Sequence, residues 1–135
     1  MNSEPHKIQA LFKKLIAQKS HEFPQRGYTA SLGVPIKQGV YIIYNLKREV
    51  VHVGRTLRGR LGLRQRLDQH LLRNSSFTIQ YLKGRGSKLR RGYKFKYLEV
   101  ENPRERALVE SLAIGKLCPK HVGLGLGHRS KKSRK

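Results

Sequence analysis

The chain has 135 residues, enough for one domain with one modest hydrophobic core. It carries 30 lysines and arginines against 8 aspartates and glutamates, for a net charge of +22. This charge indicates a polyanionic partner, above all nucleic acid, and an RNA-associated ribosomal type of protein is the alternative on charge alone. No apolar run approaches the ~18 residues of a membrane-spanning helix, and the N-terminus lacks the apolar stretch of a signal peptide. We therefore expect no membrane partner.

The single cysteine, Cys118, excludes an internal disulfide and a cysteine-rich zinc site. It stands in the apolar stretch 117–119, so we expect it to be buried by packing rather than to be a reactive thiol. A lone cysteine also favours a reducing, intracellular (cytoplasmic) location.

Residues 1–38 precede the region that carries the motifs. Apolar residues recur at helical spacing over about residues 5–19 and predict an amphipathic helix, with Pro5 in its first turn. This helix either packs on the core or lies as a basic arm against nucleic acid, and we favour packing with some contact to the nucleic-acid backbone. Prolines and glycines in residues 20–38 predict a loop.

Residues 39–44 and 50–53 are rich in β-branched and aromatic side chains and predict two strands of a β-hairpin, the second ended by Gly54. If the turn is symmetric, Tyr41 lies opposite His52, and the two side chains share one face of the hairpin. A bulge of one residue would break this pairing. Taken alone, Tyr41 is better explained as a simple core aromatic.

The middle of the chain predicts one further helix, over residues 60–73. Arg66 and His70 are one helical turn apart and are therefore neighbours on the same side of this helix. Residues 74–92 are polar and basic and give no clear element.

The last third of the chain predicts a strand and a helix. Residues 93–100 alternate aromatic and charged side chains, as in a strand with one buried face. Asn102 can cap the helix behind it, Glu105 can return a hydrogen bond to the cap, and the helix is expected to end near Leu117. The glycine-rich, basic residues 123–135 predict a flexible tail.

The last predicted helix carries Glu110 among apolar neighbours. A carboxylate in such surroundings needs a partner, which is either a divalent cation or one of the chain's many basic side chains. A single carboxylate cannot build a two-metal site, but one hard cation held by Glu110 and water is feasible.

Taken together, these residues resemble the GIY-YIG nuclease family over residues 39–122. The matching segments are Gly39-Val40-Tyr41, His52-Val53-Gly54, the pair Arg66 and His70, and Glu110. The resemblance implies an α+β fold (an α/β sandwich) with a small three-stranded antiparallel sheet flanked by helices. Residues 1–38 would add an N-terminal helix and loop, and residues 123–135 a basic tail. It further implies an endonuclease that hydrolyses phosphodiester bonds of DNA with one Mg²⁺ or Mn²⁺ ion.

The resemblance also implies a role for each matched residue. Tyr41 is a candidate general base or positions the water nucleophile, and His70 hydrogen-bonds this tyrosine or acts as the base. Arg66 would stabilise the charge of the transition state, and Glu110 would bind the metal. Gly54 permits close backbone approach where a side chain would block the substrate.

Two positions depart from the family pattern. His52 replaces the tyrosine of the second motif, which leaves the general base open between Tyr41 and His52. The asparagine expected after the last helix is absent, and His121 stands in that stretch. Both departures favour an alternative function, a catalytically weak nucleic-acid-binding module on the same fold.

Further basic residues are candidate contacts to nucleic acid. They are Arg55, Arg58, Arg60, Lys83, Arg85, Lys88, Arg90 and Arg91. We expect them to bind the phosphates of double-stranded DNA rather than to read its bases, and a solvated basic surface is the alternative. The chain can act as a monomer or a homodimer, and its sequence specificity stays open.

Overall fold

The computed structural model of the chain describes residues 3–57, 60–72 and 75–123. In chain order, its elements are α1 (Glu4–Ile16), β1 (His21–Glu22), the 3-10 helix η1 (Thr29–Leu32), β2 (Gly39–Tyr44), β3 (Val50–Arg55), α2 (Gly62–Leu72), α3 (Ser76–Gln80), the 3-10 helix η2 (Gly86–Arg90), β4 (Lys94–Glu99) and α4 (Pro103–Leu117). The expected α+β class is confirmed. Arg58 and all of the predicted tail except Gly123 lie outside the described residues.

The sheet is antiparallel and has four strands in the order β1-β4-β2-β3. The prediction of three strands is wrong by one short strand, because the predicted loop 20–38 contributes β1 to the sheet edge. This strand pairs His21 with Phe95 and Glu22 with Lys94. A strand of two residues is too short to show the alternation of side chains by which strands are predicted from a sequence.

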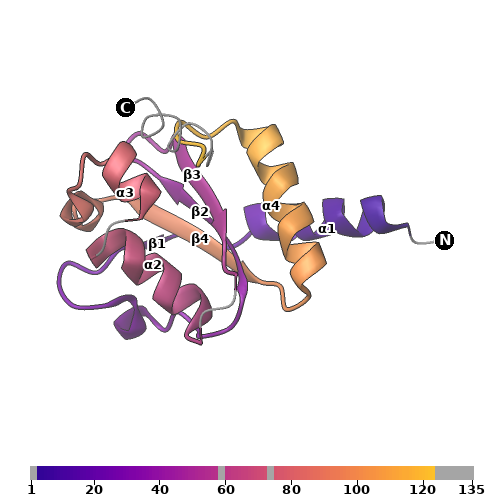
Figure 1. The fold of residues 1–135 in the computed structure, drawn as a ribbon, viewed down its shortest axis with the longest axis horizontal. Coiled ribbons are helices and arrows are strands. Elements are labelled where there is room, and N and C mark those ends of the chain that lie inside the picture. Colours follow the sequence, from indigo (N-terminus) through magenta and orange to yellow (C-terminus); the bar gives the residue numbers. More distant parts are fainter. Residues whose placement is uncertain (1–2, 58–59, 73–74, 124–135) are drawn as a thin grey trace, which may run out of the picture.

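Helices cover both faces of the sheet, α2 and α3 on one side and α1 and α4 on the other (Figure 1). Alternation along β2 sends Tyr41 and Ile43 into the core with α2 and α3, and Val40 and Ile42 into the core with α1 and α4. The N-terminal helix packs on this second core through buried Ile8, as we favoured. In the described part of the chain, no helix combines the length and the apolar character needed to cross a membrane.

The β2–β3 hairpin has a different register from the symmetric one. Tyr41 pairs with Gly54 and Ile43 with His52, and a bulge follows Ile43. The expected opposition of Tyr41 and His52 is therefore wrong, because the loop is asymmetric and places Arg48 in the left-handed region at φ 65°. Since Tyr41 and Ile43 project to the same face, Tyr41 and His52 still share it, with ring centroids 6.0 Å apart.

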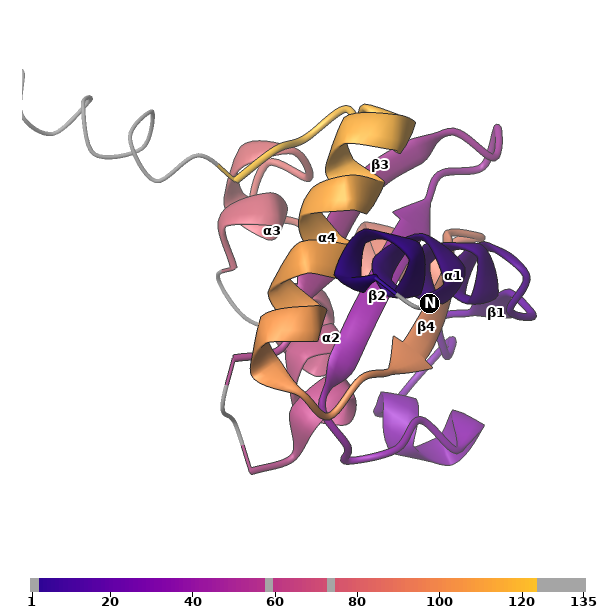
Figure 2. The ribbon, with the colours of Figure 1, turned by 90° about the vertical axis from the view of Figure 1, so that its right-hand side faces the viewer.

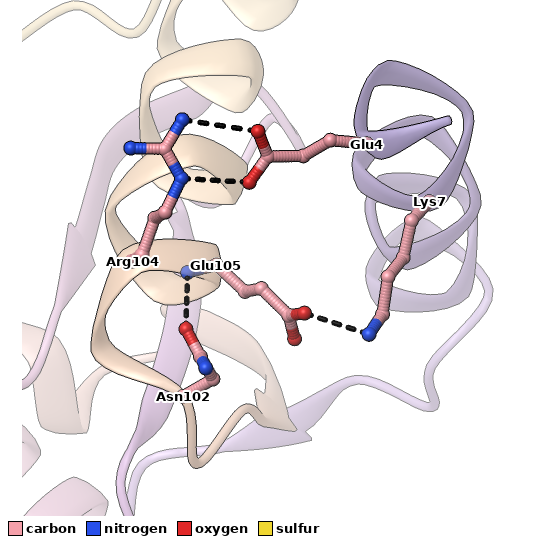
Figure 3. Close-up of polar contacts among 5 residues, drawn as sticks. All are labelled: Glu4, Lys7, Asn102, Arg104 and Glu105. Carbon is pink, nitrogen blue, oxygen red and sulfur yellow. Dashed lines mark hydrogen bonds and ion pairs between the residues drawn. The ribbon is translucent and has the colours of Figure 1, made fainter. Parts of the chain in front are cut away.

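Helix α1 lies against α4, and polar contacts join their N-terminal halves (Figures 2 and 3). Arg104 donates two hydrogen bonds to Glu4, of 2.7 and 3.0 Å, and Lys7 forms an ion pair of 2.7 Å with Glu105. Asn102 caps α4 as predicted, accepting from the backbone N–H of Glu105 at 3.0 Å. The Glu105 carboxylate reaches Lys7, so the reciprocal hydrogen bond expected from it is replaced by this ion pair.

Cys118 is exposed, which contradicts the expected burial. It ends α4 in the left-handed conformation at φ 46°, and the chain then turns so that Pro119 is buried instead. The direction of a side chain at such a helix end is set by this single backbone angle, which the apolar composition of the segment does not reveal.

Candidate active site

A cleft of about 570 Å³ opens along the edge strand β3, between α2 on one face of the sheet and α4 on the other. Three of the predicted catalytic residues line it, one from each of these elements: His52, Arg66 and Glu110. These residues are far apart in the sequence, and the order of the strands and helices brings them together.

Tyr41 lies underneath this cleft and not in its wall, since its side chain is fully buried. A Cβ added to Gly54 would lie 2.3 Å from the Tyr41 hydroxyl oxygen, far inside contact distance. Gly54 therefore allows the Tyr41 side chain to approach the β3 backbone closely. From the sequence, we expected the substrate to make this approach.

A directed chain of hydrogen bonds holds the Tyr41 hydroxyl. The Thr78 hydroxyl lies 2.5 Å from the His70 carbonyl, a group that can only accept, and the Ser75 hydroxyl donates to Thr78 at 3.0 Å. His70 Nδ1, 2.7 Å from the Ser75 oxygen, is then the donor of that bond. The remaining nitrogen of a neutral His70, Nε2, has a lone pair that accepts the Tyr41 proton at 2.5 Å. The tyrosine is thus held as a protonated donor.

Burial sets the protonation of this network. Desolvation raises the pKa of Tyr41 to about 12, against a smaller lowering by nearby Arg66. Desolvation also holds the pKa of His70 well below its ordinary value, with His52 and Arg66 acting in the same direction. Both residues are therefore neutral at pH 7.

His52 belongs to a second hydrogen-bonded chain. Its Nδ1 lies 3.1 Å from Nδ1 of His121, whose Nε2 lies 2.8 Å from the Gln80 side-chain oxygen. Burial, together with smaller effects of the neighbouring His121 and Arg66, lowers the pKa of His52 to about 3. The other ring nitrogen of His52, Nε2, is buried and has no hydrogen-bond partner in the described residues.

The two charged residues of the cleft have different partners. Arg66 is half-buried and donates a hydrogen bond of 2.8 Å to Gln69, which also lines the cleft. Glu110 forms a short ion pair with Arg55, through its Oε1 oxygen. The sequence left the partner of Glu110 open between a divalent cation and a basic side chain, and in the structure Glu110 is paired with the basic side chain of Arg55.

The donor set of the cleft fits one hard, water-coordinated cation and no larger metal centre. Glu110 is the only carboxylate in the described lining, and Arg55 occupies one of its two oxygens. Within the ranges that the structure describes, no group of three or more His, Cys, Asp and Glu is placed to hold a metal ion. A magnesium-type ion that keeps most of its water needs only one or two protein carboxylates.

Most of the basic residues predicted to contact nucleic acid do not line this cleft. Of the described ones, Arg55 alone lines it, and Arg58 is outside the described residues. Arg90 is half-buried and donates to two backbone carbonyls in the segment before η1. The exposed ones are Arg60, Lys83, Arg85, Lys88 and Arg91.

Sequence reasoning missed four residues in or around the site. Gln69 and Ser76 line the cleft, and Gln80 reaches His121, without any pattern that marks them. Arg106, which is 4% exposed, donates to four backbone carbonyls, among them those of the cleft-lining Thr56 and Leu57. An arginine on the apolar face of the predicted last helix was the available signal for Arg106.

Comparison with known proteins finds no matching protein-family model and no matching curated protein. Among solved structures, the chain is similar to the GIY-YIG N-terminal endonuclease domain of UvrC from Thermotoga maritima bound to its catalytic divalent cation, magnesium, with 21% identity and a TM-score of 0.47 over 90% of this chain and 100% of that one. A point mutant of the same domain, bound to its catalytic divalent cation, gives 22% identity and a TM-score of 0.48 over 91% of this chain and 100% of that one. These solved structures are GIY-YIG domains, the family whose motifs the sequence resembles.

Proposed function

We propose that the chain is an intracellular, divalent-metal-dependent endonuclease of the GIY-YIG type, which hydrolyses phosphodiester bonds in double-stranded DNA. One observation carries the proposal: His52, Arg66 and Glu110 converge on one cleft from β3, α2 and α4. Tyr41 lies beneath the cleft, under Gly54, and is hydrogen-bonded to His70.

Each residue has a chemical task in this reaction. Arg66 neutralises charge that develops on the phosphoryl oxygens as water attacks phosphorus. Glu110 would hold the divalent cation, which when bound supplies Lewis-acid stabilisation of the phosphoryl group. Tyr41, fixed by His70, places a polar hydroxyl under the floor of the cleft, and either Tyr41 or His52 assists the attacking water.

The charge of the chain supports DNA as the substrate. A net charge of +22 favours binding to a polyanion by release of its counterions. The exposed basic residues outside the cleft would bind backbone phosphates and position the duplex, with no readout of bases.

Nicking of supercoiled plasmid tests the proposed function. Wild-type protein is expected to nick in Mg²⁺ and to stop in excess chelator, and Glu110→Gln is expected to fall to background. Glu22→Gln, an exposed carboxylate on the edge strand β1, is the matched control and should nick like wild type. Equal activity of wild type and Glu110→Gln would overturn the assignment of Glu110.

A catalytically weak DNA-binding module is the second candidate, and the Arg55–Glu110 ion pair favours it because Arg55 competes with a cation for the carboxylate. This candidate predicts tight, salt-sensitive DNA binding with no nicking at any Mg²⁺ or Mn²⁺ concentration. Plasmid binding and nicking, measured on the same samples, distinguish the two functions.

A further inference from the structure

The hydrogen bonds around His52 have a direction, and this direction decides which of its nitrogens carries the proton. The Gln80 side-chain oxygen can only accept, so His121 Nε2, 2.8 Å away, must be the donor of that bond. A neutral His121 then has its lone pair on Nδ1. His52 Nδ1, 3.1 Å from that atom, must therefore carry the proton and donate it.

We propose that Gln80, acting through His121, fixes His52 with its proton on Nδ1, so that Nε2 keeps a bare lone pair and accepts the proton of the attacking water. This inference rests on the proposed nuclease function and identifies its general base as His52, not Tyr41. His121 and Gln80 are positioning residues, because they act on the reaction only through His52.

The state of His52 Nε2 supports this assignment. The atom is buried without a hydrogen-bond partner in the described residues, although His52 itself lines the cleft. A buried polar atom without a partner needs an explanation, and a catalytic role or a bound water is one. Arg66 lies in the same cleft, and a nearby cation favours a lone pair over a second proton on the ring.

Tyr41 is a poor competitor for this role. Its hydroxyl proton is already donated to His70 at 2.5 Å, and Tyr41 lies below Gly54 and outside the cleft lining, whereas His52 belongs to that lining. The pKa of Tyr41 is raised to about 12, mainly by burial, so the phenolate that could act as a strong base is scarcely populated at pH 7.

In the proposed step, the oxygen of water forms a bond to phosphorus while one of its protons passes to His52 Nε2. The bond from phosphorus to the leaving sugar oxygen breaks, and that oxygen keeps the electron pair and takes a proton from solvent. His52, now an imidazolium, returns its extra proton to solvent. The balance is one water consumed, one phosphomonoester and one alcohol formed.

Burial and the groups that face His52 explain its low basicity, because none of these groups supplies negative charge. Tyr41 faces it from β2, Arg66 and His70 from α2, and His121 from the segment after α4, and none of them is an anion at pH 7. From α3 it meets the uncharged ring of Phe77, which stacks on it at 4.6 Å between centroids. A DNA phosphate in the cleft adds negative charge and thereby favours the imidazolium of His52.

Nitrogen-detected NMR of ¹⁵N-histidine-labelled full-length protein tests the tautomer without any need for cleavage. In wild type, we expect His52 to show a protonated Nδ1 and an unprotonated Nε2. His121→Leu removes the acceptor and should give a mixture of tautomers. His121→Asn places an amide oxygen where the His121 Nδ1 lies, and should restore the wild-type pattern. His6→Leu, in the exposed first turn of α1, is the control and should leave the His52 signals unchanged.

Cleavage rates of the same variants complete the test. His121→Leu should slow the reaction at saturating DNA by about tenfold or more, a part of the ~10²–10⁴-fold that a positioned base contributes, and His121→Asn should recover most of it. A wild-type His52 with its proton on Nε2 overturns the inference, whatever the activity. Equal rates for wild type and His121→Leu, with their tautomers different, overturn His52 as the base. Absence of cleavage in every variant, with the expected tautomers, contradicts the proposed nuclease function and with it the role of His52 as a base, while leaving the tautomer assignment in place.

Discussion

Gly54 and Tyr41 show how tightly the site is built at the scale of single residues. The strand above the tyrosine has no room for a side chain at this position, because the hydroxyl occupies the space of the missing Cβ. The same hydroxyl makes a hydrogen bond of 2.5 Å to His70, so any movement of the ring breaks a buried polar contact. Position 54 must therefore be glycine so that the Tyr41 side chain can keep this place under β3.

Gly54→Ala is expected to destabilise the protein and to reduce DNA cleavage, because the new methyl group displaces the Tyr41 hydroxyl from His70. Overpacking of this kind costs about 1–3 kcal/mol, measured by chemical unfolding. Gly115→Ala is the control, since nothing lies within 4 Å of the added Cβ on α4, and helical alanine should raise stability by about 0.5–1 kcal/mol. Equal stability of Gly54→Ala and wild type would contradict the contact.

The buried histidines make stability depend on pH. Burial lowers the pKa of His52 to about 3 and that of His70 well below its ordinary value. Below pH ~6.5, the unfolded chain protonates both residues while the folded chain does not, so unfolding becomes easier as the pH falls. Their contribution is fully present above this pH and is lost toward the folded pKa values.

Between pH 6 and pH 5, the free energy of unfolding should therefore fall by about 1.4 kcal/mol per pH unit for each of His52 and His70. Urea unfolding at closely spaced pH values measures this slope. His52→Asn should reduce the slope by one histidine's share, whereas His6→Asn, exposed on α1, should not. A stability that is flat over this range would contradict burial of neutral histidines.

At the scale of elements, Arg106 ties α4 to the end of β3. Its guanidinium donates to the carbonyls of Thr56, Leu57, Val100 and Glu101, at 2.9 to 3.1 Å. Thr56 and Leu57 form one edge of the cleft, so this arginine sets the distance between the strand and the helix that carries Glu110. The end of β3 is therefore joined to α4 by hydrogen bonds from a buried guanidinium.

Arg106→Gln should destabilise the fold by at least ~2 kcal/mol, because buried carbonyls lose their charged donor. Arg104→Gln, two positions earlier on the exposed side of α4, removes only the surface pair with Glu4 and should change the stability little. Thermal unfolding of the two variants side by side makes the comparison. Equal destabilisation of both would show that Arg106 does not hold the β3 end in place.

Most helices and strands were predictable from the sequence, whereas the register of the β2–β3 hairpin and the short helix α3 were not. Hydrophobic periodicity gave α1, α2, α4 and the three longer strands, because each buries one repeating face. The hairpin register depended on Arg48 in the left-handed region and on the two hydrogen bonds that the Asn45 side chain accepts from the loop backbone. Helix α3 is too short to show a period.

The site was predictable where a motif marked it and unpredictable where it depended on partners. The resemblance to the GIY-YIG motifs implied roles for Tyr41, His70 and Glu110, and the structure brings the first two into contact. With 30 basic residues in the chain, nothing in the sequence singled out Arg55 as the partner of Glu110. Gln80 joins the site only because α3 folds back toward the segment after α4.

At the scale of the whole molecule, the two cores on either side of the sheet leave the edge strand β3 as the place where both helix layers meet. The cleft lies along this edge, so a long duplex can reach it from outside without entering the body of the protein. The net charge of +22 provides a general attraction for the duplex, whereas the proposed chemistry is confined to a few residues.

DNA affinity should therefore fall steeply as the salt concentration rises. Each phosphate contact should add about −0.9 to the slope of log K against log[salt]. Neutralising exposed cations after α3 should reduce that slope more than neutralising an equal number on the α1 side, since α1 packs on α4. The matched triple variants, measured by fluorescence anisotropy, are Arg85, Lys88 and Arg91 to Gln against Lys13, Lys14 and Lys19 to Gln. Equal slopes would place the DNA across both surfaces.

The most direct test of the central claim, that the cleft performs phosphodiester hydrolysis, is the single-turnover cleavage rate of an end-labelled duplex at saturating protein and Mg²⁺. Arg66→Gln, within the cleft, should lower this rate by ~10²–10³-fold, because it removes a charged donor to the transition state. Arg85→Gln, which removes the same charge at an exposed position outside the cleft, should leave the rate unchanged. Cleavage by Arg66→Gln at the wild-type rate, or no cleavage by wild type, would contradict phosphodiester hydrolysis in this cleft.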